Sequence, residues 1–157
     1  MKRLPLSLTL LFISLVMLST IAFSQEKQST EQNDAQKKSG DMIVLITGFD
    51  SNDGGVRVAL NNSDENYQSS NPFNHAAEKI VDYKVEFTFK DIPFGEYAIK
   101  CYHDENLNGK MDRNSMGIPV EAYGFSNNAV GNFGPAKYDD AKFTFNKDKQ
   151  IVEIELQ

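Results

Sequence analysis

The chain predicts an all-β sandwich of about seven short strands over residues 41–157. Short stretches in which apolar and polar side chains alternate recur along this segment, and residues typical of turns separate them. No stretch repeats its apolar residues with the period of a long amphipathic helix. The segment has the length of one domain, so we expect a single hydrophobic core.

The first half of this segment predicts a central strand and a hairpin. Residues 42–48 are apolar on both faces, as expected for a strand covered on both sides. Residues 52–55, Asn-Asp-Gly-Gly, favour a turn because glycine adopts positive φ without strain. Alternation resumes over 56–61, so this strand is expected to pair with the first one. Residues 62–80 predict an irregular connection with a helical turn at 75–79.

The second half predicts the remaining strands. Strict alternation over residues 83–90 is typical of a half-buried strand. The turn at 91–96 leads into a strand whose apolar face contains residues 97, 99 and 101. Alternation over residues 141–145 and again over 152–156 closes the sheets.

The residues before the domain predict an export signal and a tether. A basic start at Lys2 and Arg3, an apolar run over 4–21 and small residues before Gln25 indicate a secretory signal peptide, residues 1–24. An uncleaved anchor is disfavoured, because the run is near the minimum for a membrane span. Residues 25–40 are polar and predict a disordered linker. We expect a periplasmic or extracellular protein without a transmembrane segment in its mature chain.

The charge of the mature chain argues against nucleic acid as a partner. Without Lys2 and Arg3, the 16 basic residues fall to 14 against 22 acidic ones, a net charge of −8. A surface of that sign repels nucleic acids and anionic membranes, because no basic stripe offsets phosphate. Cys101 lies in an apolar strand pattern, so we expect a buried small hydrophobic side chain rather than a reactive thiol.

Residues 104–112 predict a metal-binding loop. Oxygen-bearing side chains stand at every second position, followed by a glycine and a further carboxylate. This spacing matches an EF-hand-type loop, in which alternate side chains, one carbonyl and the ninth position bind Ca²⁺. The candidate ligands are Asp104, Asn106, Asn108, Lys110 through its carbonyl, Asp112, and Glu121 reaching back from the following segment.

The ligand types favour Ca²⁺ over transition metals, because all are hard oxygens without paired His or Cys. The loop offers fewer oxygens than calcium prefers, and its twelfth position is Ser115 rather than a bidentate glutamate. The alternative is a hairpin loop in which Asn and Asp bond their own backbone and Gly109 adopts positive φ.

A second candidate site is the glycine- and aromatic-rich segment 116–136. Aromatic faces there are suited to stacking on a sugar or a peptide, and nearby amides to hydrogen bonding. The candidate ligand-binding residues are Tyr123, Phe125, Asn127 and Asn128. The alternative is a long connection whose aromatic side chains pack against the edge of the sandwich.

Motifs for catalysis are weak. His103 next to the acidic loop is a candidate base with Glu121, but the sequence contains no nucleophile elbow, phosphate loop or zinc pattern. A single His at the end of a strand is more often a hydrogen-bonded structural residue.

The motif at residues 89–97, Phe-Lys-Asp-Ile-Pro-Phe-Gly-Glu-Tyr, resembles the turn and strand of transthyretin-like and carboxypeptidase regulatory-like domains. Further motifs at residues 103–106, 117–128, 133–135 and 140–143 resemble the Domain of Unknown Function 2141 family. This resemblance implies an exported bacterial β-domain with an immunoglobulin-like, transthyretin-like sandwich and no established activity.

These observations favour a calcium-stabilised binding or structural module at the cell envelope, with a glycan or a protein as its partner. The alternative is a small envelope hydrolase or isomerase that uses His103 and Glu121.

The predicted signal peptide is tested by the mass of the mature protein. Because Ala22 and Ser24 present small residues before the cut, the exported protein should begin at Gln25. Intact-mass spectrometry of the exported fraction measures this. A membrane-bound mature species that retains residues 1–24 would contradict it.

Overall fold

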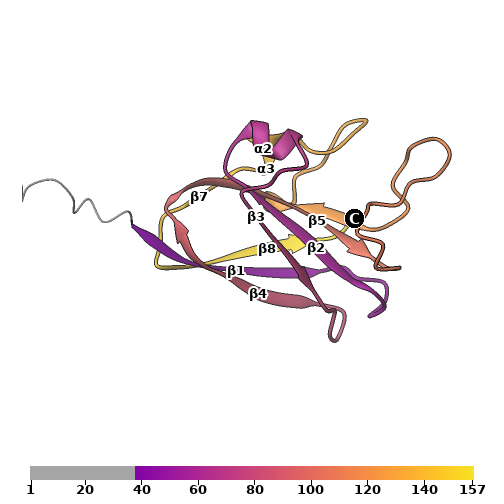
Figure 1. The fold of residues 1–157 in the computed structure, drawn as a ribbon, viewed down its shortest axis with the longest axis horizontal. Coiled ribbons are helices and arrows are strands. Elements are labelled where there is room, and N and C mark those ends of the chain that lie inside the picture. Colours follow the sequence, from indigo (N-terminus) through magenta and orange to yellow (C-terminus); the bar gives the residue numbers. More distant parts are fainter. Residues whose placement is uncertain (1–37) are drawn as a thin grey trace, which may run out of the picture. The chain divides into compact units, whose positions relative to one another are not determined.

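A computed structural model describes residues 38–157 as two β-sheets packed face to face (Figure 1). The predicted signal peptide and most of the predicted linker lie outside these residues. The all-β prediction is confirmed. Among the described residues, no helix has the length and apolar character needed to cross a membrane.

The smaller sheet has the strand order β4-β1-β8. Its central strand, β1 (Ser39–Thr47), pairs in parallel with β8 (Lys149–Glu155) and antiparallel with β4 (Val85–Pro93). The apolar residues on both faces of β1 suit this central place: Met42, Val44 and Ile46 on one face are fully buried, and Ile43 on the other face is 9% exposed. The strand includes Ser39 and Gly40, so the predicted linker extends two residues too far.

The larger sheet has the order β3-β2-β5-β6, and β7 pairs with the first part of β5. Its long central strand β5 leads directly into the acidic loop. The strands of this sheet are β2 (Gly55–Asn61), β3 (Asn74–Glu78), β5 (Gly95–Asp104), β6 (Tyr123–Phe125) and β7 (Phe143–Phe145).

The main core lies between the two sheets. Alternate residues of each strand point into it, as the sequence pattern predicts for Tyr97, Ile99 and Cys101 on β5. Fully buried side chains from both sheets, among them Ile46 and Phe145, fill the space. This apolar burial is the main favourable contribution to folding.

The outer face of the larger sheet carries a second, smaller cluster. Two short helices, α2 (Asp64–Gln68) and α3 (Tyr138–Ala141), and the turn η1 (Ser126–Asn128) cover part of that face. The ring of Tyr67 packs edge-on against Tyr138, and its hydroxyl donates a hydrogen bond to the carbonyl of Ala136.

The predicted hairpin between the first two strands is wrong, because β1 and β2 belong to different sheets. The connection crosses between the sheets, and Phe49 within it is 6% exposed and packs against His103. A buried aromatic residue in the turn stabilises a crossing connection rather than a tight hairpin, and Gly48 and Gly54 take positive φ at its ends.

Three local predictions also differ from the structure. Residues 75–79 do not form a helical turn; β3 pairs with the edge of β2, and this pairing overrides the helix propensity of Ala76 and Ala77. Tyr83 is not on the core face of β4 but in a tight turn with φ of 58°. Ala141 ends α3 instead of starting the next strand.

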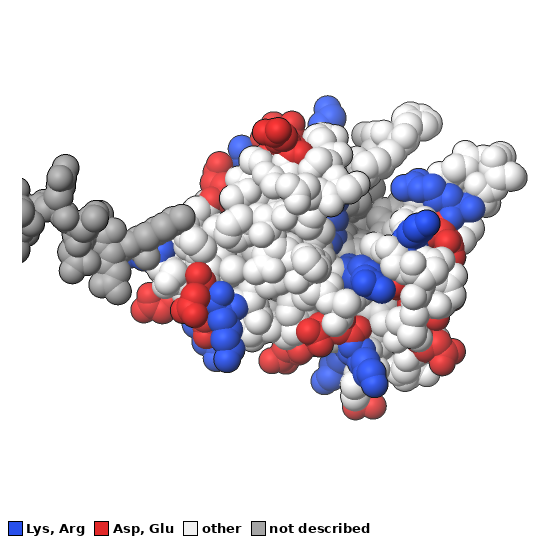
Figure 2. All heavy atoms as spheres, viewed as in Figure 1, with Lys and Arg blue, Asp and Glu red and all other residues white. Residues whose placement is uncertain are grey.

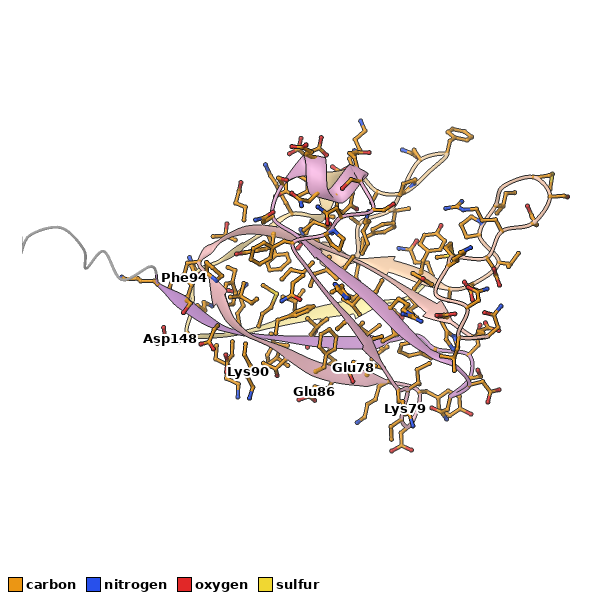
Figure 3. All side chains as sticks on the ribbon, in the orientation of Figure 1. Glu78, Lys79, Glu86, Lys90, Phe94 and Asp148 are labelled. Atoms are coloured by element: carbon orange, nitrogen blue, oxygen red, sulfur yellow. The ribbon has the colours of Figure 1, made fainter. Side chains whose placement is uncertain are left out.

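The stability of the core is tested on β4. Phe89 is 6% exposed and packs on Phe87, so Phe89→Ala should lower the free energy of unfolding by about 3–5 kcal/mol. Glu86 points away from the sandwich (Figure 3), and Glu86→Ala should stay within about 0.5 kcal/mol. Urea unfolding measures both changes. Equal losses for the two variants would contradict the facing of β4.

Candidate functional site

The acidic loop begins where β5 leaves the larger sheet. The last two residues of β5 are His103 and Asp104. Both are buried, although neighbouring residues of a strand normally point to opposite faces. The turn before β2 lies against this point: a Cβ added to Gly54 would lie 2.2 Å from the carbonyl oxygen of Asp104. Only glycine permits such a close approach, so this turn holds the start of the loop against the sandwich.

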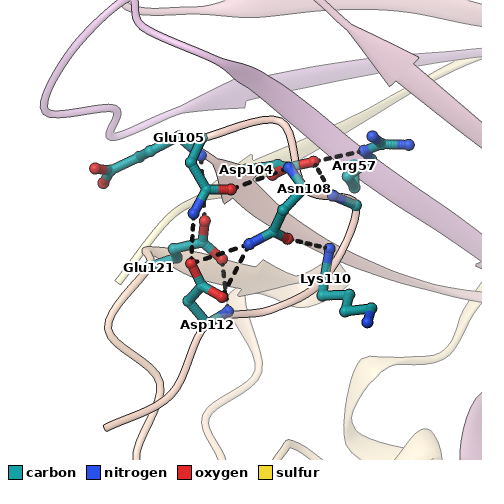
Figure 4. Close-up of polar contacts among 9 residues, drawn as sticks. Arg57, Asp104, Glu105, Asn108, Lys110, Asp112 and Glu121 are labelled. Atoms are coloured by element: carbon teal, nitrogen blue, oxygen red, sulfur yellow. Dashed lines mark hydrogen bonds and ion pairs between the residues drawn. The ribbon is translucent and has the colours of Figure 1, made fainter.

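Asp104 is the buried anchor of the loop (Figure 4). Its side chain is fully buried, and its Oδ2 accepts hydrogen bonds from Nε of Arg57 at 2.8 Å and from the amide of Gly109 at 3.0 Å. Arg57 comes from β2, so the Asp104 carboxylate links β5, the loop and β2. Its other oxygen, Oδ1, is buried without a hydrogen-bond partner among residues 38–157.

The outer part of the loop is closed by its own side chains. Oδ1 of Asn106 accepts from the amide of Asn108 at 3.0 Å, and Oδ1 of Asn108 accepts from the amide of Lys110 at 2.7 Å. The side-chain NH₂ groups of both asparagines donate to the carboxylate of Asp112, at 2.6 and 3.0 Å. The loop therefore has the Asx turns of the hairpin alternative.

Glu121 reaches back to this loop from the segment before β6. Its side chain is 5% exposed. Oε1 accepts from the amide of Glu105 at 3.2 Å, and Oε2 accepts from the amide of Asp112 at 2.8 Å. One carboxylate thus ties the first and last parts of the loop together.

The structure links five of the six predicted metal ligands by hydrogen bonds: Asn106, Asn108, Lys110, Asp112 and Glu121. The sixth, Asp104, is held separately by Arg57 and the amide of Gly109, so the six do not form a ready coordination shell. Within residues 38–157, no three carboxylate, imidazole or thiol groups gather at one point. A cation would therefore depend on amide and carbonyl oxygens as well. The NH₂ groups of Asn106 and Asn108 now face Asp112. To bind a cation between them and Asp112, these side chains would turn their oxygens inward.

His103 and Glu121, the candidate catalytic pair, have structural contacts. The His103 ring is 1% exposed, packs edge-on against Phe49, and its Nε2 lies 2.7 Å from the carbonyl oxygen of Asp53. Both carboxylate oxygens of Glu121 accept backbone hydrogen bonds. A cleft lies on the outer face of the larger sheet, and neither residue lines it.

The four predicted ligand-binding residues divide into two groups. Tyr123 and Phe125 on β6 line a cleft on the outer face of the larger sheet, although Phe125 is only 5% exposed. Asn127 and Asn128 do not line it. The Asn127 amide donates to the carbonyl of Lys142 at 2.9 Å, and Asn128 accepts from the amide of Glu155 at 2.9 Å.

The basic residues of that cleft are not among the site residues predicted from the sequence. Arg57 and Lys100 occupy polar positions of β2 and β5, which the alternation pattern assigns to the outer face. The same alternation points Cys101 inward, where burial raises the pKa of its thiol to about 12. This thiol stays protonated at neutral pH, as expected for a buried small hydrophobic side chain.

Comparison with known families gives one match. The sequence profile of a family described as "Uncharacterized protein conserved in bacteria (DUF2141)" matches residues 44–153, which is most of the described domain. No curated protein and no solved structure matches the chain.

The role of Glu121 in closing the loop is tested by truncation. Glu121→Ala leaves two amides of a partly buried loop without their acceptor, so unfolding free energy should fall by about 1–3 kcal/mol. Chemical denaturation measures this loss. The control is Glu86→Ala, which removes an exposed carboxylate on β4 and should change stability little. A loss no larger than that of the control would mean that these two hydrogen bonds do not hold the loop.

Proposed function

The chain belongs to the DUF2141 family of uncharacterised bacterial proteins, and on that premise we propose that it is an exported β-sandwich module with a calcium-binding loop. The family description names no activity, so the proposal rests on the chain's own residues. In it, Ca²⁺ stabilises the loop, and the module serves binding or structure at the cell envelope.

The observation that carries the calcium proposal is the free oxygen of Asp104. A buried carboxylate oxygen without a hydrogen-bond donor is costly, because it has lost its water without a replacement. It stands at the first ligand position of the loop, where a cation would compensate that loss. Gly109 has φ of 76°, the sharp turn that such a loop needs at its sixth position.

The other oxygens support a weak site rather than a tight one. Calcium binds about six to eight oxygens, and the loop provides its carboxylates, two asparagine amides and the carbonyl of Lys110. Binding also competes with the hydrogen bonds that Asp112 now accepts. We therefore place the affinity in the range of extracellular modules, with Kd of about 10⁻⁴–10⁻³ M.

Export and an envelope location are supported by the N-terminal sequence pattern and by the acidic charge. Such an affinity requires millimolar calcium, the concentration range in which extracellular modules bind it.

The finer fold proposal is an immunoglobulin-like, transthyretin-like sandwich. Two face-to-face sheets and the Phe-Lys-Asp-Ile-Pro-Phe-Gly-Glu-Tyr turn at residues 89–97 support it.

The calcium proposal is tested by thermal unfolding of the mature domain. A ligand that binds only the folded state stabilises it by RT ln(1 + [L]/Kd), about 1.4 kcal/mol at ten times Kd. With about 10 mM Ca²⁺, the melting temperature should therefore rise by roughly 4–7 °C over the value in EDTA. Magnesium should raise it less, because it requires a tighter octahedral shell.

Two variants separate ligation from loop structure. Asp112→Asn keeps the size and an acceptor oxygen but removes the charge, so the calcium-dependent rise should be lost. Lys110→Ala should keep the rise, because only the carbonyl of that residue is a ligand. Asp104→Ala is a poorer test, since it also breaks the contacts with Arg57 and Gly109. If the wild-type protein melts at the same temperature in calcium and in EDTA, the calcium proposal is wrong and the loop is a hairpin closed by its own hydrogen bonds.

A further inference from the structure

A cleft of about 1500 Å³ lies on the outer face of the larger sheet. Strands β2 and β5 contribute to it, and two long loops flank it: residues 109–119 on one side and 131–135 on the other. Both loops extend beyond the sheets in Figure 1, and Figure 2 shows a hollow between two white projections. Of the proposed calcium loop, only Gly109, Lys110 and Met111 belong to this lining.

The charge of the cleft is opposite to that of the chain. Its lining contains Arg57, Lys100, Lys110 and Arg113 and no Asp or Glu. The chain as a whole has 22 acidic and 16 basic residues. Four basic side chains thus gather in this cleft, and of these Arg57 is already paired with Asp104, which lies outside the lining. This local complementarity favours an anionic ligand.

Lys100 on β5 is a half-buried cation of the cleft. Its Nζ donates a hydrogen bond to the carbonyl of Tyr67 and lies 4.7 Å from the centroid of the Tyr67 ring. No carboxylate of residues 38–157 forms an ion pair with it. Burial lowers the pKa of its ammonium, since part of its hydration is lost without a compensating anion. An anion in the cleft would supply that missing partner.

The two flanking loops add apolar walls that no part of the described domain covers. Met116 is 77% exposed, Ile118 is 53% exposed, and Phe133 is fully exposed at 113%. All three line the cleft. Exposed apolar side chains on both sides of one cleft, around a basic floor, indicate a ligand that has apolar as well as charged parts.

From this arrangement we propose that the cleft binds a single anionic amphiphile, with its carboxylate or phosphate near Lys100 and Arg57 and its aliphatic chain along the apolar loops. The exposed aliphatic side chains of Met116 and Ile118 distinguish this ligand from an acidic sugar, which could stack on Phe133 but would leave these two residues in water. The net charge of −8 in the mature chain distinguishes it from an anionic membrane surface, which would repel the domain. A single molecule meets only the local charge, because salt screens more distant charges.

The test is isothermal titration calorimetry of the mature domain with decanoate, decanol and acetate, below the concentration at which micelles form. The buffer contains EDTA, so that the result does not depend on the calcium loop. Decanoate should bind about tenfold or more tightly than decanol, because only its charge pairs with Lys100. Acetate, which has no chain, should bind too weakly to measure.

Variants locate the binding in the cleft. The double change Met116→Ser and Phe133→Ser should weaken decanoate binding at least tenfold, while Ile151→Ser, which changes another exposed apolar residue on β8, should not. Lys100→Gln should remove the preference for decanoate over decanol, while Lys90→Gln on the other sheet should keep it. Thermal unfolding checks that each variant is folded. If Lys100→Gln does not fold, the affinities of the wild-type protein for decanoate and decanol still decide the role of charge.

Three results would overturn the proposal. They are equal affinities for decanoate and decanol, decanoate binding that survives the double change in the loops, and binding of alginate or phosphatidylglycerol vesicles without binding of decanoate. The first would remove the role of the basic floor, the second that of the apolar walls. The third would assign the cleft to an acidic glycan or to a membrane.

Discussion

The buried carboxylate of Asp104 is the contact on which the arrangement of both sites depends. It stands at the last residue of β5, pairs with Arg57 of β2 and accepts the amide of Gly109 in the loop. A buried ion pair contributes little net stability, but loss of one partner leaves a charge that is costly to bury. The contact therefore specifies where the loop leaves the sheet and how Arg57 is held. Arg57 is 40% exposed, which moderates this cost.

The alternation of β5 divides its residues between two functions of the domain. Tyr97, Ile99 and Cys101 face the core and bind the two sheets together. Lys100 lies between Ile99 and Cys101 in the sequence, and Tyr102 follows Cys101; both line the cleft on the outer face. A shift of one residue in the pairing with β2 would exchange these faces and bury Lys100 in the core. The requirement for an apolar core thus also determines which residues are available to a ligand.

Local patterns in the sequence predict the strands well but not their partners. The alternation at residues 152–156 and the apolar faces of β1 identify strands, because burial on one or both faces leaves a direct pattern. The pairing of β1 with β8 joins opposite ends of the domain, and no local signal encodes it. Phe49 in the first connection was the missed signal for a crossing between sheets. Likewise, the spacing of residues 104–112 predicts the loop network, while the cleft depends on the distant loop that carries Phe133.

Arg57 connects the two proposed sites, and this sets the sign of any coupling between them. Its Nε binds Asp104 in the acidic loop, and the same residue lines the basic cleft. A calcium ion that draws on the Asp104 carboxylate weakens its hold on Arg57 and adds positive charge nearby. Both effects favour an anion in the cleft, so the coupling should be positive. By thermodynamic linkage, an anion bound in the cleft must then increase the affinity of the loop for calcium by the same factor.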